Sequence, residues 1–542
     1  MGAHGPVAAL LLLLCACIAP AASAQSVPLE VRAEILPGSE LESYLRLLQT
    51  VGEVPLHPWG VRGFSPAEVD RLLPADSVQH PWKSHYQLSR GESPPHLAWV
   101  RPRAQIYYNS AFPYGVNDGP VWAGRGLTTA LSAGFAARYG PLSLTVIPTL
   151  FRAQNASFPL APTGLEGRLR FADAWNPTFI DHPQRFGDGA YTRLDPGQST
   201  LRLDAGGLAL GVSTANQVWG PAMEFPLILG TNAPGFPHAF LGTAHPLDLW
   251  VGHLYGRMVW GRLDQSDYSP MTGVDSRRFM AGFAASFTPR GVPGLELGVT
   301  RFFHMGWGEE GPDADDFLKP LQTLFKGGIG GRGDNSDAAN QLISVFGRWV
   351  FPHSGFEAYG EFAREDHNWD LRDFILEPDH DSAYLIGLRK AWLRGPDRMV
   401  AFRAELANGE ISHLFRVREQ APFYRHSKLR QGHTQLGQIL GSPAVYGGAG
   451  AVVGLDLYRP DGRWSLTWSR VVNGYGGAFW QAGITNLQAA DVSQSLGAEA
   501  LFFSGPFDVT AGLTGVYEMN RHLVTRNDQF NLNARLGLRW AW

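Results

Sequence analysis

The last residues of the chain alternate between apolar and polar or small side chains. Residues 530–542 place Phe, Leu, Ala, Leu, Leu, Trp and Trp on one face, and mostly Asn, Arg and Gly on the other. Successive side chains of a β-strand point to opposite faces, so a period of two predicts a strand with one apolar and one polar side. The same period recurs at 464–469 and 507–517, and it begins near Trp99. From that residue onward, the chain is therefore predicted to be mostly β-structure.

Short turns join the predicted strands in pairs. They are rich in Gly, Pro and Asp, and they lie at 140–141, 206–207, 289–294, 352–355, 394–397, 459–462 and 504–506. Longer polar or Gly-rich connections, such as 214–246, alternate with them, which is typical of a membrane β-barrel with short turns on one side and long loops on the other. A further turn, which we place near His253–Gly256, brings the predicted count to about 18 strands, and bacterial barrels favour even counts.

A closed sheet is the form that hydrocarbon tolerates. An unpaired backbone N–H or C=O group is costly there, so a sheet in a bilayer must have no free edge. A soluble β-sandwich or propeller would alternate too, but Trp and Tyr residues concentrate near the strand ends, as in the aromatic belts of membrane proteins. The chain also ends on an apolar-face aromatic residue, Trp542, which resembles the insertion signal of outer-membrane proteins. These features favour an all-β, transmembrane antiparallel β-barrel.

Residues 1–24 are predicted to be a secretory signal peptide. Leu10–Leu14 form the centre of an apolar run, and Ala22-Ser23-Ala24 supplies small residues for cleavage after Ala24. Leu14-Cys15-Ala16-Cys17 also resembles a lipobox, which would leave a lipidated Cys17. Both cysteines of the chain lie in this segment, so the exported protein is expected to form no disulfide. The expected location is the cell outer membrane.

Residues 25–96 are predicted to form a small helical segment. Ser39 and Glu42 have the spacing of a capping box for a helix that ends near Gly52. Ser65-Pro66 predicts the start of a second helix, with Pro at its first position. Helices this short need a surface to pack against. The barrel itself is predicted over residues 97–542.

The sequence gives little support for catalysis, for a cofactor or for nucleic acid binding. The net charge is −4 without a basic stripe, and H-E-x-x-H, G-x-S-x-G and S-x-x-K motifs are absent. We interpret Gly328–Gly333, which matches G-x-G-x-x-G outside a βαβ unit, as a flexible loop. We interpret the acidic stretch 309–316 as a solvated loop in preference to a Ca²⁺ site. Asp379-His380-Asp381 has no second cluster with zinc spacing. We expect no catalytic residue, no cofactor and no metal, although a barrel lipase or deacylase with a dispersed triad stays open.

A set of polar residues shares the predicted lumen face of three consecutive strands. It consists of Glu357, Tyr359, Glu361 and Glu365 on one strand, Arg389 on the next, and Arg403 and Glu405 on the one after. Opposite charges on neighbouring strands can pair and fill a barrel interior. One interpretation is a structural network that plugs the lumen. The other is a polar path for a solute, which would make the protein a porin or a solute-specific outer-membrane channel.

Residues 213–243 contain the most specific motif of the chain. Its matching positions are Trp219-Gly220-Pro221, Leu227–Leu229, Asn232-Ala233 and Phe236-Pro237. Together with 248–252, 359–361 and 537–540, this block resembles the capsule-assembly outer-membrane protein family of the Wzi type. Val218 departs from that pattern, because the family often has a second Trp before the Gly-Pro pair. The likeness extends in outline over most of the chain after residue 24, but only the 213–243 block is specific. The resemblance also implies that the helical segment 25–96 lies on the periplasmic side.

The resemblance implies a barrel that binds, anchors or organises exported capsular or surface polysaccharide in the manner of a lectin, without being an enzyme. Aromatic, Asn, Asp and Arg side chains in outside loops suit such a ligand. The candidate carbohydrate-binding residues are Trp175, Asn216, Trp219 and Asn232, for which turn-forming or packing roles are the alternative. The expected partners are the polysaccharide, outer-membrane lipid and, during insertion, the barrel-assembly machinery.

Overall fold

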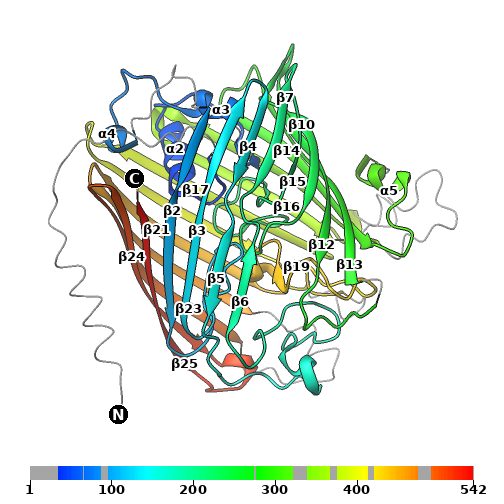
Figure 1. The fold of residues 1–542 in the computed structure, drawn as a ribbon. Helices are drawn as coiled ribbons and strands as arrows, with labels where there is room; N and C mark the ends of the chain where they lie inside the picture. The colour runs from blue at the N-terminus through cyan, green and yellow to red at the C-terminus, as the bar shows by residue number, and fades with distance from the viewer. Residues whose placement is uncertain are drawn as a thin grey trace.

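The wall of the molecule is a closed antiparallel β-barrel. The structure is a computed structural model that describes residues 35–64, 66–86, 96–273, 276–321, 339–365, 375–412, 420–473 and 490–540. Figure 1 shows the barrel from the side, with the short turns at the top. The wall strands are β2 (Leu97–Asn109), β3 (Gly126–Tyr139), β4 (Leu142–Val146), β5 (Thr149–Ala153), β6 (Tyr191–Asp195), β7 (Thr200–Ala205), β8 (Leu208–Ser213), β10 (His238–Thr243), β11 (Leu247–Leu249), β12 (Gly252–Asp264), β13 (Arg277–Pro289), β14 (Leu295–Gly306), β15 (Ala339–Phe351), β16 (Phe356–Glu365), β17 (Ser382–Leu393), β18 (Met399–Asn408), β21 (Ala449–Arg459), β22 (Gly462–Asn473), β23 (Asp491–Ser504), β24 (Phe507–Met519) and β25 (Gln529–Trp540).

Three positions in the wall are each occupied by two short strands in line. β4 and β5 share the position beside β3, and β10 and β11 share the position beside β12. β6 and β7 share the third such position, where β6 pairs with β5 and β7 pairs with β4. Pro148, Pro196 and Pro246 lie at these interruptions, because Pro has no N–H to donate to the ladder. With each interrupted pair taken as one, the described wall has 18 strands, as predicted, and β2 pairs with β25 to close it.

The seven short turns predicted from Gly, Pro and Asp all join neighbouring strands in the structure. The turn predicted near His253–Gly256 is wrong, because these residues pair with 285–288 inside the β12–β13 ladder. The chain reverses instead at Trp250–Val251, where Leu249 pairs with Gly252. Trp and Val carry no turn signal, so the pattern misplaced this turn. The predicted connection 214–246 is also too long, because strand β10 begins at His238 and β11 follows it within 238–249.

The outer face of the wall is apolar. On β22, Trp464, Leu466 and Trp468 point outward, and Leu466 is 51% exposed, whereas Ser469 points inward and bonds Ser495 at 2.7 Å. β25 follows the alternation predicted for it, with Phe530 exposed and the neighbouring Asn residues buried on the lumen side. Apolar side chains on the outside and polar ones inside are the arrangement of a membrane barrel.

The segment before β2 is helical and packs at the short-turn end of the barrel (Figure 1). It contains α2 (Glu40–Thr50), β1 (Val61–Arg62), α3 (Pro66–Leu72) and α4 (Lys83–Tyr86). Ser39 caps α2 as predicted, because its Oγ accepts a hydrogen bond from the Glu42 N–H at 3.2 Å. The Glu42 carboxylate accepts from Gly38 N–H at 2.6 Å and so closes the cap one residue earlier than a capping box does.

The remaining short elements lie in the loops at the long-loop end and between strands. They are η2 (Gly167–Phe171), β9 (Val218–Trp219), α5 (Ala314–Leu318), η4 (Lys319–Leu321), η6 (Pro352–Ser354), β19 (Thr434–Gln435), β20 (Gln438–Ile439), η8 (Pro443–Val445) and η9 (Arg521–Leu523). The predicted signal peptide with Cys17 and the loop Gly328–Gly333 lie outside the described residues.

None of the helices described here is both long enough and apolar enough to cross a bilayer.

Candidate functional site

Two sets of segments fill the lumen of the barrel. The inner plug, residues 35–64 and 66–86, enters from the short-turn end, and the outer plug, residues 214–237 and 420–448, folds inward from the long-loop end. The two plugs meet in a small antiparallel sheet, in which Val61 of β1 pairs with Trp219 of β9. Protein therefore occupies the lumen from both ends.

Glutamates of the wall accept hydrogen bonds from the main chain of both plugs. Glu296 of β14 accepts from the N–H groups of Trp59 and Gly60 at 2.9 and 2.8 Å. Glu405 of β18 accepts from the N–H groups of residues 223–225 at 2.9, 3.2 and 2.6 Å. Irregular backbone leaves donors that no ladder satisfies, and an ionised carboxylate can accept several of them at once. The wall carboxylates thus fix segments that have little regular structure of their own.

Arg46 of α2 makes the central ion pair of the inner plug. Its Nε donates to Glu357 Oε1 at 2.9 Å, and Arg348 Nε of β15 donates to the same oxygen at 3.1 Å. Thr50 Oγ1 donates to the other carboxylate oxygen at 3.0 Å. The Arg46 and Glu357 side chains are both completely buried. Removing one partner of such a pair leaves an uncompensated buried charge, which costs about 3–5 kcal/mol.

The residues of the predicted lumen network contact the plugs as well as one another. Tyr359 Oη donates to Glu405 at 2.7 Å, and Arg403 Nε donates to Glu224 of the outer plug at 3.1 Å and also pairs with Asp456. Glu365 accepts from Tyr424 N–H, in the outer plug, and from Asn340 at 2.7 Å. Arg389 lies directly opposite Glu357 in the strand register. These contacts fit the interpretation of the network as a structural plug.

Sequence reasoning missed three members of this network. Glu296 and Arg348 face each other across β14 and β15 and lie 3.5 Å apart, so the alternation of those strands carried a signal for them. Arg46 lies on a helix, where a strand pattern gives no information. Its partner could not be identified without the fold.

Gly220 of the Trp219-Gly220-Pro221 motif lies against Glu361. Its φ is +88°, and a Cβ at this position would come within 2.3 Å of Glu361 Oε2, so both the backbone and the space require Gly. Glu361 is buried, and neither of its carboxylate oxygens has a hydrogen-bond partner among the described residues. The motif therefore packs closely against β16 at Glu361.

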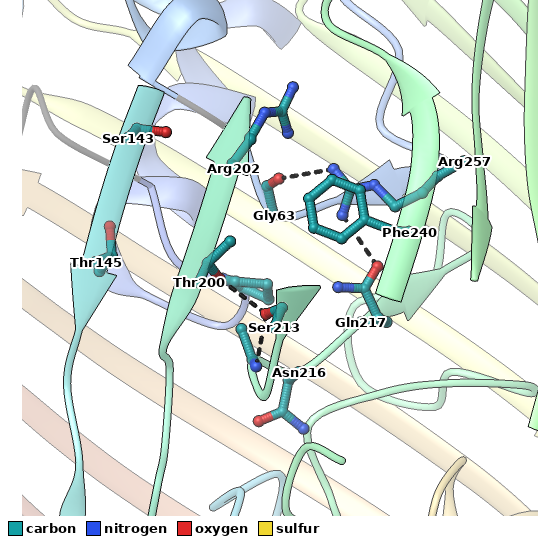
Figure 2. Close-up of a pocket in the computed structure, with 12 residues that line it drawn as sticks. Gly63, Ser143, Thr145, Thr200, Arg202, Ser213, Asn216, Gln217, Phe240 and Arg257 are labelled. Carbon is teal, nitrogen blue, oxygen red and sulfur yellow. Dashed lines mark hydrogen bonds between the residues drawn. The ribbon is translucent and has the colours of Figure 1, made fainter. Parts of the chain in front are cut away.

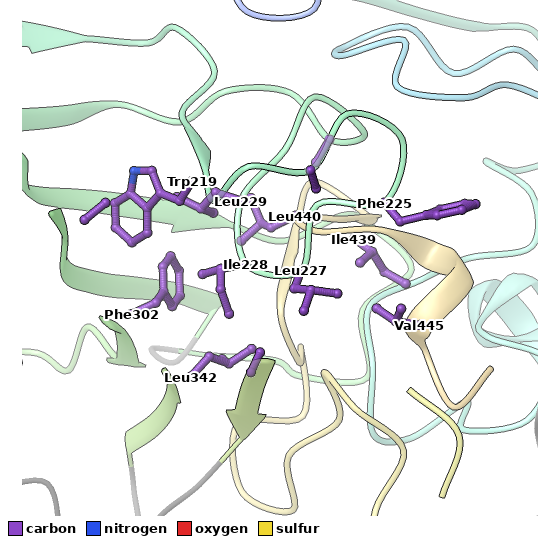
Figure 3. Close-up of a cluster of buried hydrophobic side chains, with 14 of the residues drawn as sticks. Trp219, Phe225, Leu227, Ile228, Leu229, Phe302, Leu342, Ile439, Leu440 and Val445 are labelled. Carbon is purple, nitrogen blue, oxygen red and sulfur yellow. The ribbon is translucent and has the colours of Figure 1, made fainter. Parts of the chain in front are cut away.

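An apolar cluster forms the centre of the outer plug (Figure 3). Leu227, Ile228 and Leu229 are buried there with Trp219, Phe302 and Leu342, and the second segment contributes Ile439, Leu440 and Val445. His433 Nε2 donates to Ile228 O at 2.7 Å, and burial lowers the pKa of His433 to about 3, so the ring is neutral at physiological pH. An apolar centre of this kind is typical of a packed interior and not of a water-filled channel.

A small polar cavity remains between the wall and the plugs (Figure 2). Its volume is about 20 Å³, which holds about one water molecule. It is surrounded by the wall residues Ser143, Thr200, Ser213 and Arg257 and by Gln217 of the outer plug. Arg257 Nη1 donates to Gln217 Oε1 at 3.0 Å. A sugar ring does not fit in this volume.

The four candidate carbohydrate-binding residues lie in different surroundings. Trp219 is fully buried in the apolar cluster, where its indole contacts Phe302. Asn216 Nδ2 donates to the carbonyls of Gly230 and Ala233, and Asn232 Nδ2 donates to Ile439 O at 2.8 Å. These contacts give the two Asn residues a role in joining plug segments. A carbohydrate role for all four residues stays a prediction.

Trp175 differs from the other three because it lies half-buried in the long loop 154–190. Its backbone N–H donates to Asp173 Oδ1 at 3.0 Å. Asn176 Nδ2 donates to Tyr446 Oη at 2.8 Å, and His182 lies 3.2 Å from Asp173. This polar group joins the loop to the outer plug at the long-loop end of the barrel.

The chain was compared with known proteins. A family model described as capsule assembly protein Wzi matches residues 117–514, and no curated protein sequence matches. Wzi of Escherichia coli, described as an outer-membrane protein involved in group 1 capsule assembly and a carbohydrate-binding β-barrel, is similar in fold. It is 14% identical with a TM-score of 0.61, and the match covers 94% of this chain and 100% of the other.

Two proteins of Pseudomonas aeruginosa, OccK2 and the outer membrane protein OprD, are more distant. OccK2 is 10% identical with a TM-score of 0.40, and the match covers 82% of this chain and 96% of the other. OprD is 9% identical with a TM-score of 0.38, and the match covers 82% and 92%. The family match extends over most of the described barrel, from the loop after β2 into β24. The protein is an outer-membrane β-barrel that belongs to the capsule assembly protein Wzi family.

Proposed function

We propose that the protein binds and organises exported surface or capsular polysaccharide at the outer side of the outer membrane, as a closed barrel without catalytic activity. The observation that carries the proposal is the filled lumen. Its centre is the apolar cluster around Leu227–Leu229, and carboxylates of the wall fix both plugs. A barrel filled in this way offers its long loops, and not its interior, to a polymer. The carbohydrate-binding relative from Escherichia coli supports the choice of ligand.

Of the four candidate residues, Trp175 is the one we propose to contact the glycan. Its indole lies half-buried at the long-loop end, whereas Trp219 is fully buried. Aromatic faces stack on sugar rings, and Asn, Asp and Arg side chains nearby supply hydrogen bonds. We further propose that outer-membrane lipid contacts the apolar outer face and that the barrel-assembly machinery inserts the chain.

The test is the retention of polysaccharide at the cell surface. A strain that lacks the gene is complemented with the wild type, with Trp175→Ala or with Trp250→Ala, and cell-bound and released polysaccharide are measured. Trp250 is 91% exposed at a short turn, on the side away from the polymer, so it serves as the matched control. We expect lower retention without the gene and with Trp175→Ala, and wild-type retention with Trp250→Ala. Unchanged retention after deletion of the gene would remove the proposal.

The second candidate function is a porin or solute channel. The polar residues on the lumen side of β16–β18 are the observation in its favour. Planar-bilayer recording of the purified protein separates the two functions. We expect no steady open current, and large steady currents would favour the channel.

A further inference from the structure

A short helical arm of this protein lies on the outside of the barrel, although its position in the chain belongs to an extracellular loop. The arm consists of α5 and η4, residues 314–321, in the connection between β14 and β15. In Figure 1, α5 is separated from the lumen by the wall and lies beside β12 and β13. Connections of this kind in a barrel normally extend into the water above the membrane.

The strand register shows that the arm rests on outward-facing side chains. Trp260, Ala281, Phe303 and Gln341 form one cross-strand row on the outside, and the next residue along each strand points into the lumen. Trp260 Nε1 donates to Phe317 O at 2.9 Å, and the rings of Phe317 and Phe279 lie 4.9 Å apart. The arm therefore packs against the face of the wall that meets lipid.

The outward-facing Arg301 gives the arm a physical role at this part of the wall. Arg301 of β14 lies in the outward row between Val299 and Phe303, and it is only 2% exposed. It donates from Nη1 to Pro320 O of the arm at 3.1 Å and from Nη2 to Gln341 Oε1 at 2.7 Å. A charged side chain that faces hydrocarbon without such acceptors is destabilising. The arm supplies the acceptor and shields the charge.

The second half of the arm exposes apolar side chains. Leu318 is 53% exposed and Leu321 is 66% exposed, and the outward-facing Leu297 and Val345 on β14 and β15 are exposed as well. Two residues of the acidic stretch 309–316 are used locally, because Asp313 and Asp316 form a reciprocal N-terminal cap on α5 and Asp316 pairs with Lys319 at 2.7 Å. Glu309, Glu310 and Asp315 are exposed. Exposed leucines are costly in water and favourable against acyl chains.

We infer that residues 317–321 are embedded in the extracellular half of the bilayer, where Leu318 and Leu321 contact acyl chains and Pro320 accepts a hydrogen bond from Arg301. The arm is thus a lipid-binding surface of the protein and not a part of its polysaccharide-binding loops. The inference rests on the proposed contact between lipid and the outer face of the wall, and it is independent of the proposed polysaccharide binding.

Single-cysteine labelling tests the inference, because the sequence has no cysteine after Cys17. Leu318→Cys and Leu321→Cys carry an environment-sensitive fluorophore, and the full-length mature protein is placed in phosphatidylcholine vesicles. Leu466→Cys, on the outer face of β22, is the lipid reference, and Val524→Cys, 55% exposed in the loop before β25, is the water reference. Quenching is measured with iodide in the water and with a nitroxide-labelled phosphatidylcholine in the bilayer.

We expect labels at 318 and 321 to match the Leu466→Cys reference, with a blue-shifted emission, quenching by the nitroxide lipid and loss of iodide quenching. Labels that match the Val524→Cys reference would overturn the inference. Each variant is first run on a gel before and after heating. A folded barrel migrates more slowly after heating, and only protein that shows this change is measured. Because both positions are exposed, the substitutions themselves remove little packing.

Discussion

The inner and outer plugs close the same barrel by different means. The inner plug is joined to the wall through the chain leading to β2, and it is held by the Arg46–Glu357 pair and by aromatic packing, in which the rings of Trp82 and Tyr458 of β21 lie 5.2 Å apart. Segment 214–237 of the outer plug continues directly into β8 and β10, segment 420–448 continues into β21, and an apolar cluster holds the centre of the outer plug. The chain therefore ties the outer plug to the wall at more points than it ties the inner plug.

The largest expected effect comes from breaking the outer plug at its carboxylate. Glu405→Ala leaves three N–H groups and the Tyr359 hydroxyl without an acceptor, so we expect a loss of about 3–5 kcal/mol in the free energy of unfolding. Urea unfolding in vesicles measures it. Glu410→Ala, in an exposed loop, is the control and is expected to leave stability unchanged. Equal effects of the two variants would contradict the importance of this carboxylate.

Breaking the ion pair of the inner plug is expected to lower the free energy of unfolding somewhat less than Glu405→Ala does. The loosening is expected to stay within the inner plug. Arg46→Met leaves the Glu357 carboxylate with Arg348 as its remaining cation within hydrogen-bond distance, at a cost of about 3 kcal/mol. Chymotrypsin should then cleave α2, while the wall strands stay protected. Adding Glu357→Leu removes the buried charge as well, so the double variant is expected to regain part of the stability. A double variant with a lower free energy of unfolding than Arg46→Met alone would argue against a stabilising role of the ion pair.

Acid is expected to loosen the inner plug through His80. Burial, with a smaller contribution from Lys83, lowers the pKa of His80 from 6.5 to about 4, and its Nδ1 lies 2.8 Å from Tyr44 Oη. The folded state keeps the ring neutral, whereas the unfolded chain binds a proton below about pH 6.5. The stabilisation is therefore present above pH 6.5 and is lost as the pH falls toward 4, by at most about 3 kcal/mol.

Hydrogen exchange of α2 and α4 between pH 7 and pH 4 measures this effect. His80→Phe should remove the part of the pH dependence that belongs to this residue. An unchanged pH profile in that variant would assign the effect to other groups, such as the buried His433 of the outer plug.

The smallest effect is expected at the cap of α2. Ser39→Ala removes the acceptor for the Glu42 N–H and should cost about 1 kcal/mol. Ser39→Asp retains an acceptor and should restore the wild-type value. Faster exchange confined to the first turn of α2 would agree with a local cap, whereas faster exchange in the outer plug would show that the two plugs unfold together.

The wall could be predicted from the sequence because its physics is local. Lipid on one side and a polar lumen on the other impose a period of two, which residues 530–540 follow in the structure. Turns at Gly, Pro and Asp residues also formed where expected. The reversal at Trp250–Val251 could not be predicted, because the ladder and not the residue type fixes it.

The filling of the lumen was only partly predictable. The alternation of β16 placed Glu357, Glu361 and Glu365 on the lumen face. It could not identify their partners, because Arg46, Gly220 and Tyr424 come from segments far away in the chain. The inward path of residues 214–237 likewise depends on contacts with residues 420–448 that no local pattern encodes.

The pairing of β2 with β25 also fixes an order of assembly. Export from the N-terminus delivers the inner plug before the described wall strands and delivers β25 after the other described strands, so the seam can form only when β25 has crossed. Until then two strand edges stay unpaired, a state that is prone to aggregation. A chain that stops before β25 should consequently remain an open sheet around its plug, without the heat-dependent gel shift of the complete barrel.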